Sequence, residues 1–133
     1  MKPFIQLKGN YKSLIAYQKA ECIYDITYYF AHKYFSKGDR TIDQMIQAAR
    51  SGKQNIVEGS SAATTSSETE IKLYNVARAS LQELLIDYED YLRVNNYQQW
   101  DVNSDKAKRA REACTKHNDS TYYRNAIQKR SAE

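Results

Sequence analysis

The sequence predicts an all-α protein that folds as an antiparallel up-and-down four-helix bundle with a poorly defined fourth helix. Helix breakers are scarce, since the 133 residues include 4 Gly and 1 Pro, and that Pro is at position 3. Apolar residues recur every three or four positions along extended segments, without strand-like alternation. The length fits one domain over residues 1–133, and 41% hydrophobic with 27% charged residues are ordinary for a folded chain.

The first helix is expected over residues 13–35, with Ser13 as its N-cap. Its apolar stripe is wide enough to contact more than one neighbouring helix. The stripe contains Ala16, Ala20, Ile23, Thr27, Phe30 and Tyr34, and it is widened by Ile15, Cys22, Ile26 and Tyr29. Gly38 then supplies a helix stop and a connector.

The second helix is expected over residues 41–58. Gly52 lies near its middle, where glycine costs about 1 kcal/mol relative to alanine, so we expect a neighbouring helix to approach closely there. Gly59 and the small polar residues 60–66 are expected to end the helix. Its buried face is expected to contain Ile42, Met45, Ile46, Ala49 and Ile56.

The third helix is expected over residues 67–93 and has the clearest start. Ser67 and Glu70 have the spacing of a capping box, and Glu68 adds negative charge to the first turn. The expected apolar face contains Ile71, Tyr74, Ala77, Leu81, Leu84, Leu85, Tyr88 and Leu92.

The last part of the chain is expected to contain a loop over 94–102 pinned by Trp100, a helix over 104–117 and a further short helical stretch over 121–129. Asn103 or Ser104 is expected to cap the 104–117 helix. The apolar residues of that helix are too small to complete a core: Ala107, Ala110, Ala113 and Cys114. We therefore expect that another subunit, or residues after Glu133, completes the core.

Charge is distributed unevenly along the chain, which carries a net +4 and has a pI near 9.0. Residues 61–103 hold 3 Lys/Arg against 7 Asp/Glu, whereas residues 104–133 hold 8 against 4. This balance permits a phosphate-bearing partner, although oppositely charged helices also simply attract each other. The candidate nucleic-acid-binding residues are Arg50, Lys53, Lys106, Lys108, Arg109 and Arg111. The alternative is a solvated basic surface.

The chain is rich in tyrosine, with 12 residues. Tyr24, Tyr28, Tyr91 and Tyr97 are candidates for stacking on bases. Tyrosine is equally suited to subunit contacts, where one end of the side chain is apolar and the other wet. The interface interpretation is the favoured one.

No catalytic, cofactor-binding or metal-binding residue is identified. His32 and His117 are isolated from any nucleophile or carboxylate that the sequence could place beside them. Glu83, Asp87 and Asp90 share a helix face, but the Glu-x-x-His motif of di-metal bundles is missing, so a solvated acidic face is favoured. We therefore expect a non-enzymatic protein without cofactor or metal.

Cys22 and Cys114 are far apart and lack the spacing of a metal site, which favours two reduced thiols in a cytoplasmic protein. The start of the chain lacks the apolar run of a secretory signal. No segment approaches the roughly 18 apolar residues of a membrane span, so no membrane partner is expected.

Two segments resemble a known family. Gln47-Ala48-Ala49-Arg50-Ser51 leads into Asn55-Ile56-Val57-Glu58-Gly59, and the pattern continues through Leu73-Tyr74-Asn75-Val76-Ala77-Arg78-Ala79-Ser80-Leu81-Gln82-Glu83-Leu84. Together with Ala16-Tyr17-Gln18-Lys19-Ala20 in the first helix, these segments resemble the bacterial four-helix-bundle proteins encoded in ribosomal-RNA intervening sequences. The resemblance covers about residues 13–93.

This resemblance implies an antiparallel four-helix bundle without enzymatic activity that assembles as a ring-like homopentamer. The family is similar to the accessory variability protein of diversity-generating retroelements, a basic pentamer that binds a reverse transcriptase and nucleic acid. The resulting hypothesis is a protein that acts through self-association and through binding RNA, DNA or a nucleoprotein. The alternative is an accessory subunit that binds a protein partner only.

Overall fold

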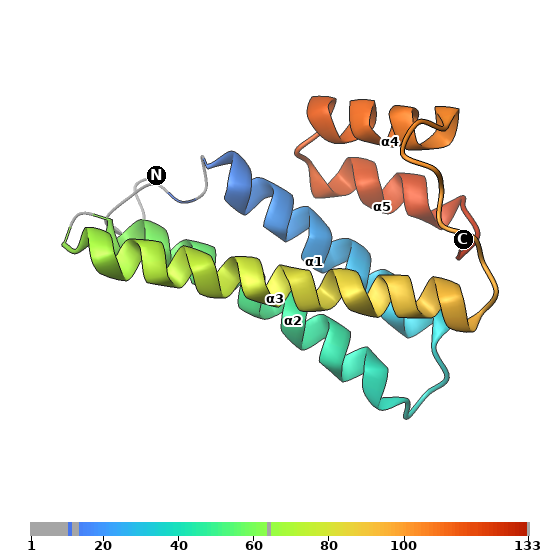
Figure 1. The fold of residues 1–133 in the computed structure, drawn as a ribbon, viewed down its shortest axis with the longest axis horizontal. Coiled ribbons are helices and arrows are strands. Elements are labelled where there is room, and N and C mark those ends of the chain that lie inside the picture. The colour runs from blue at the N-terminus through green and yellow to red at the C-terminus, as the bar shows by residue number, and fades with distance from the viewer. Residues whose placement is uncertain (1–10, 12–13, 64, 133) are drawn as a thin grey trace.

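A computed structural model describes residues 11, 14–63 and 65–132, and every regular element in these ranges is an α-helix. The helices are α1 (Ile15–Tyr34), α2 (Arg40–Ala62), α3 (Ser67–Val94), α4 (Asp105–Lys116) and α5 (Ser120–Gln128) (Figure 1). The predicted all-α fold class is therefore confirmed. The predicted N-cap Ser13 lies outside the described residues.

The first three helices form an antiparallel bundle in which α2 packs against both α1 and α3. One end of its core is centred on Met45, Ala49 and Leu84, which are 2% exposed or less. A second cluster joins Ala20, Ile56 and Ala77 toward the other end. Because half of these side chains are alanine, the helices can pack close together. Figure 1 shows the three helices side by side.

Close packing between α2 and α3 confirms the approach predicted at Gly52. A Cβ atom placed on Gly52 would lie 2.6 Å from Leu81 Cδ2, so only glycine leaves room for the leucine. The same holds at Gly59, where a Cβ would lie 2.6 Å from Tyr74 Cε1. The prediction that Gly59 ends the second helix was wrong, because this glycine makes room for a tyrosine and the helix continues to Ala62.

The N-cap of helix α3 lies one residue before the predicted position. Ser66, not Ser67, is the N-cap, and its side chain accepts a hydrogen bond from the Thr69 backbone N–H at 3.2 Å. The predicted Ser67–Glu70 capping box is therefore wrong. Glu68 and Glu70 both lie in the first turn, where their negative charge interacts favourably with the helix dipole. Ile71 and Leu85, placed on the buried face by the sequence, are 61% and 52% exposed.

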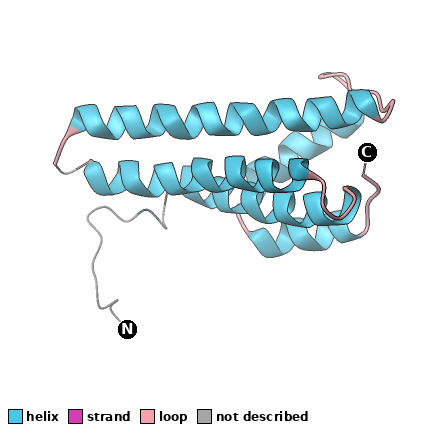
Figure 2. Cartoon of the chain, turned by 90° about the horizontal axis from the view of Figure 1, so that it is seen from below, coloured by secondary structure: helices cyan, strands magenta, loops and turns pink. Residues whose placement is uncertain are grey.

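Helices α4 and α5 form a hairpin beside the bundle rather than its fourth helix (Figures 1 and 2). Helix α5 packs on α1, and no Cα atom of α4 lies within 8 Å of a Cα atom in another helix of the described chain. The caps are Ser104, as predicted, and Asp119. The difference from a four-helix bundle follows from composition, since neither α4 nor α5 contains a fully buried residue.

The wide apolar stripe of α1 is used within the chain, except at Ile15 and Ala16, which are exposed. One side of it packs on α2, and another side packs on α5. Between them, Thr27 Oγ1 and the Tyr88 hydroxyl of α3 are 2.8 Å apart, and the Phe30 ring lies 4.9 Å from the Tyr91 ring. Helix α1 thus has three partners in its own chain, which explains the width of the stripe.

Candidate functional site

A groove of about 1000 Å³ lies between α2 and α3. No residue of α1 lines it, so it lies on a side of the α2–α3 pair that α1 leaves open. Its lining residues are Asp43, Gln44, Ile46, Gln47, Ala48 and Ser51 from α2, and Ser80, Glu83, Ile86 and Asp87 from α3.

The groove forms because the facing side chains are small or polar. Ser51 Oγ and Ser80 Oγ are 2.8 Å apart and join the two helices at one end. Asn55 Nδ2 also donates to the Ser51 carbonyl oxygen at 2.8 Å, which holds this end of the groove in place. Part of the lining is apolar, because Ala48, which is nearly buried, and Ile86, which is 51% exposed, both line the groove.

The walls of the groove carry three carboxylates, which belong to Asp43, Glu83 and Asp87. Burial raises the pKa of Asp87, and the nearby carboxylates of Asp90 and Glu83 raise it further. The predicted solvated acidic face is therefore partly wrong, because Asp87 is half-buried and faces the groove. Among the described residues, no group of three His, Cys, Asp or Glu side chains is placed to hold a metal ion.

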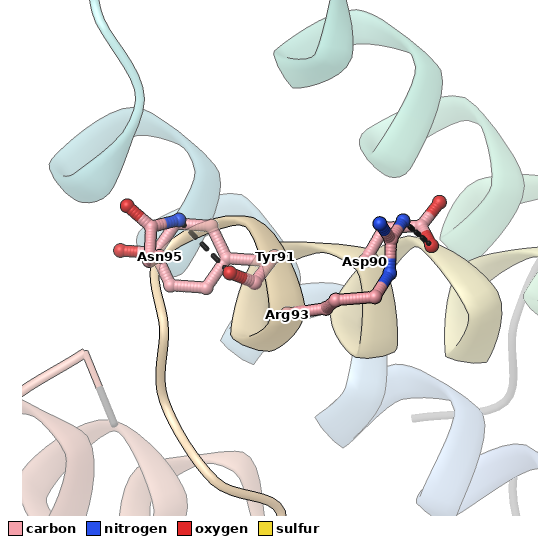
Figure 3. A network of polar contacts seen from close by, with 4 residues as sticks. All are labelled: Asp90, Tyr91, Arg93 and Asn95. Carbon is pink, nitrogen blue, oxygen red and sulfur yellow. Dashed lines mark hydrogen bonds and ion pairs between the residues drawn. The ribbon is translucent and has the colours of Figure 1, made fainter.

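Asp90 differs from these carboxylates because it is paired. Arg93 Nη2 lies 3.0 Å from Asp90 Oδ1, and Asn95 Nδ2 donates to the Tyr91 carbonyl oxygen at 2.9 Å where α3 ends (Figure 3). Within the described ranges this is the only ion pair. No cation of the described ranges therefore lies within 4 Å of Asp43, Glu83 or Asp87.

Helix α4 carries the opposite charge. Its basic residues are Lys106, Lys108, Arg109, Arg111 and Lys116. Lys108, Arg111 and Lys116 lie on one face together with Glu112 and Thr115, where they border a shallow depression of about 340 Å³. In the described part of the chain, none of these cations lies within 4 Å of a carboxylate oxygen.

The predicted nucleic-acid-binding residues fall into two separate groups. Arg50 is exposed on α2, and Lys53 Nζ lies 4.4 Å from the centre of the Tyr24 ring. The other four, on α4, include Lys106, whose Nζ lies 5.7 Å from the Trp100 ring. Because α2 and α4 do not pack together, the structure does not join the two groups into one basic patch.

The tyrosines considered for base stacking are mostly engaged in the fold. Tyr24 packs against the core, and Tyr91 contacts Phe30 and Phe35. Tyr28 is 51% exposed and lies against His32, with ring centres 4.3 Å apart. Tyr97 is exposed beside Tyr91. No pair of these four forms a parallel open platform, since both contacts between them are tilted.

The remaining candidate chemistry has structural partners. His117 stacks on Tyr122 with ring centres 3.6 Å apart, and the Tyr123 hydroxyl donates to the His117 carbonyl oxygen at 2.7 Å. Burial raises the pKa of the Cys22 thiol, which disfavours the reactive thiolate. Trp100, predicted to pin its loop, is instead exposed beside Lys106.

The sequence pattern singled out Glu83 and Asp87 of the groove but neither Asp43 nor the groove itself. Asp43, Gln47 and Ser51 recur every four residues on α2, and Ser80, Glu83 and Asp87 share a face of α3. Each pattern alone is typical of a solvated face, and only the pairing of the two helices brings them together. Lys116 was missed because it lies five residues after the basic run.

Comparison of the chain with protein-family models, with curated proteins and with solved structures gives no match. None of the helices in the described ranges combines the length and the apolar character that a membrane crossing requires.

Proposed function

We propose that this chain is a non-enzymatic, cytoplasmic helical-bundle protein that acts through self-association. The observation that carries the proposal is the open groove between α2 and α3. A helix pair has two crevices along its length, and α1 covers only one of them. The other is lined in part by the apolar side chains of Ala48 and Ile86, which favours a further helix as its cover.

Additional apolar side chains on α3 support the same proposal. Val76 is 42% exposed and Val94 is 69% exposed. Exposed apolar area of this kind often marks an interaction site. The resemblance of residues 47–59 and 73–84 to rRNA intervening-sequence proteins is a second support, since it implies a homopentamer.

The proposal is tested by measuring molar mass with size-exclusion chromatography and light scattering over a range of protein concentrations. We expect a multiple of the 15.5 kDa chain mass. Ile86→Glu places a charge in the apolar part of the groove lining. It should shift the protein toward the monomer, because burying an unpaired charge is costly. Leu85→Glu is the matched control, because Leu85 is equally exposed but does not line the groove.

A second function, binding of RNA, DNA or a nucleoprotein such as a reverse transcriptase complex, is favoured by the unpaired cations of α4. Replacing Lys108, Arg109 and Arg111 by Gln should weaken binding to single-stranded nucleic acid and flatten its salt dependence, by about 1 in the log–log slope for each lost phosphate contact. Retention that is absent at low salt would leave the alternative, an accessory subunit with a protein partner only.

A further inference from the structure

We infer that the α2–α3 groove is filled by the basic face of helix α4 from a second copy of this chain. The inference rests on the proposed self-association and names the surfaces that make the contact. The two surfaces have complementary charge and similar length.

The groove supplies the negative partner. Among the described residues, no cation lies within 4 Å of its three carboxylates, on Asp43, Glu83 and Asp87. The carboxylates that line the groove repel one another, and a bound cationic helix relieves that repulsion. A polyanion such as nucleic acid would be repelled from the same groove.

Helix α4 supplies the positive partner. Lys108, Arg111 and Lys116 project from one face around a single carboxylate, Glu112, so the face has a net charge of +2. The side chains of this face are accessible, since Lys108, Arg111 and Lys116 are all exposed.

The two surfaces also match in length. Eight residues separate Lys108 from Lys116, which at 1.5 Å per residue is about 12 Å along the helix axis. Eight residues likewise separate Asp43 from Ser51 along the α2 wall, and seven separate Ser80 from Asp87 along the α3 wall. One face of α4 therefore spans the groove from end to end.

The contact is between chains because α4 is held elsewhere in its own chain. Helix α5, the second helix of the hairpin, packs on α1. Helix α4, the first, is held there as well, because Lys19 Nζ of α1 donates to the Cys114 carbonyl oxygen of α4. In contrast, no residue of α1, α4 or α5 lines the groove. Joining two different surfaces makes either a reciprocal dimer or a ring that repeats the same contact.

Charge reversal provides the test. Glu83→Lys with Asp87→Lys reverses the groove, and Lys108→Glu with Arg111→Glu reverses α4. We expect each double variant to weaken self-association about tenfold or more in sedimentation velocity, because like charges then face each other. An equimolar mixture of the two variants should associate again, since each reversed surface then meets its complement. A chain carrying all four substitutions should self-associate for the same reason.

Matched controls are Glu89→Arg on α3 and Arg124→Glu on α5, which reverse exposed charges outside both surfaces and should not change association. Helical circular dichroism of each variant checks folding, and the single change at exposed Glu83 serves if the double variant does not fold.

The outcomes separate the inference from the proposed function. Wild-type protein that stays monomeric overturns both. Wild-type oligomers that persist unchanged in both reversed variants leave self-association standing and overturn the α4 contact. A loss in the groove variant alone, without rescue by the α4 variant, shows a different occupant and also overturns the inference.

Discussion

The α1–α3 bundle and the α4–α5 hairpin are held together by different forces. In the bundle, Met45 and Ala49 are fully buried, and glycine on α2 admits Leu81 and Tyr74 from α3. In the hairpin no residue is fully buried, and several of its contacts are polar. The Tyr34 hydroxyl donates a hydrogen bond to the Arg130 carbonyl oxygen at 3.1 Å, and the Tyr123 hydroxyl donates one to the His117 carbonyl oxygen.

This difference separates stability from binding. A core of small, interlocked side chains tolerates little change, because its packing leaves no room for adjustment. A hairpin attached through hydrogen bonds contributes about 0.5–1.5 kcal/mol for each such bond and keeps its surface accessible. The bundle therefore determines how α1, α2 and α3 fold, while the residues of α4 stay exposed or half-buried.

The largest difference between the two regions is expected for removal of an aliphatic side chain. Leu84→Ala in the bundle core should lower the free energy of unfolding by about 2–5 kcal/mol, since Leu84 is 2% exposed and leaves a cavity. Ile127→Ala in α5 should cost clearly less, because Ile127 is only half-buried. Chemical denaturation of both variants measures the comparison, and equal losses would show that the hairpin is part of the same core.

Overpacking the bundle should have the next largest effect. Gly52→Leu should destabilise the protein by roughly 1–3 kcal/mol, because the new side chain occupies the space of Leu81. Arg50→Leu, on an exposed position of the same helix, is the control for helix propensity and should leave stability nearly unchanged. Thermal unfolding that shows no loss for Gly52→Leu would remove the close approach of α2 and α3 from this account.

Loosening the hairpin should leave the bundle intact. Tyr123→Phe removes the hydroxyl that donates to the His117 carbonyl oxygen and should cost about 0.5–1.5 kcal/mol. Because that bond lies between α4 and α5, amide hydrogen exchange should accelerate in α4 while α2 and α3 keep their protection. Tyr122→Phe is the matched control. Faster exchange throughout the chain would contradict the separation of the two regions.

The smallest effect is expected from the groove carboxylate of Asp87. Its pKa is raised, mainly by burial, so the folded chain binds the proton more tightly than the unfolded chain, whose Asp pKa is about 3.9. Stability is therefore lost as pH rises from about 3.9 through the folded-state pKa.

Asp87→Asn removes that loss and should be more stable than wild type near neutral pH, by less than about 1 kcal/mol after screening by solvent. The advantage should disappear in acid. Thermal unfolding of dilute protein at both pH values, with Glu89→Gln as the control, measures it. A less stable Asp87→Asn near neutral pH would instead show that Asp87 has a stabilising partner in the monomer.

The helices and their order could be predicted from sequence because each has strong local signals. Apolar periodicity locates α1, α2 and α3 within a few residues of their observed bounds, and Ser104 marks the start of α4. Gly52 was predictable as a contact point because a mid-helix glycine needs a packing reason. Gly59 is also a helical glycine, but the sequence predicted it as a helix end. Its reason is the packing of Tyr74, fifteen residues later in the chain.

The groove and the arrangement of the hairpin could not be predicted, because both depend on which helix faces which. The wide stripe on α1 indicated several partners, but not that α5 would be one of them and leave the far side of α2–α3 open. Likewise, Glu83 and Asp87 are typical of a solvated face until Asp43 of α2 is placed opposite them.

The most direct test of the central claim measures whether the groove is covered in solution. Gln47→Cys introduces a thiol in the groove, and Gln82→Cys introduces one on α3 outside it, both in a Cys114→Ser background because Cys114 is exposed. The rate of thiol labelling is then followed as protein concentration rises. We predict that labelling at position 47 slows with concentration while labelling at position 82 stays constant. Equal, concentration-independent rates at both positions would contradict the account, because the groove would then remain open.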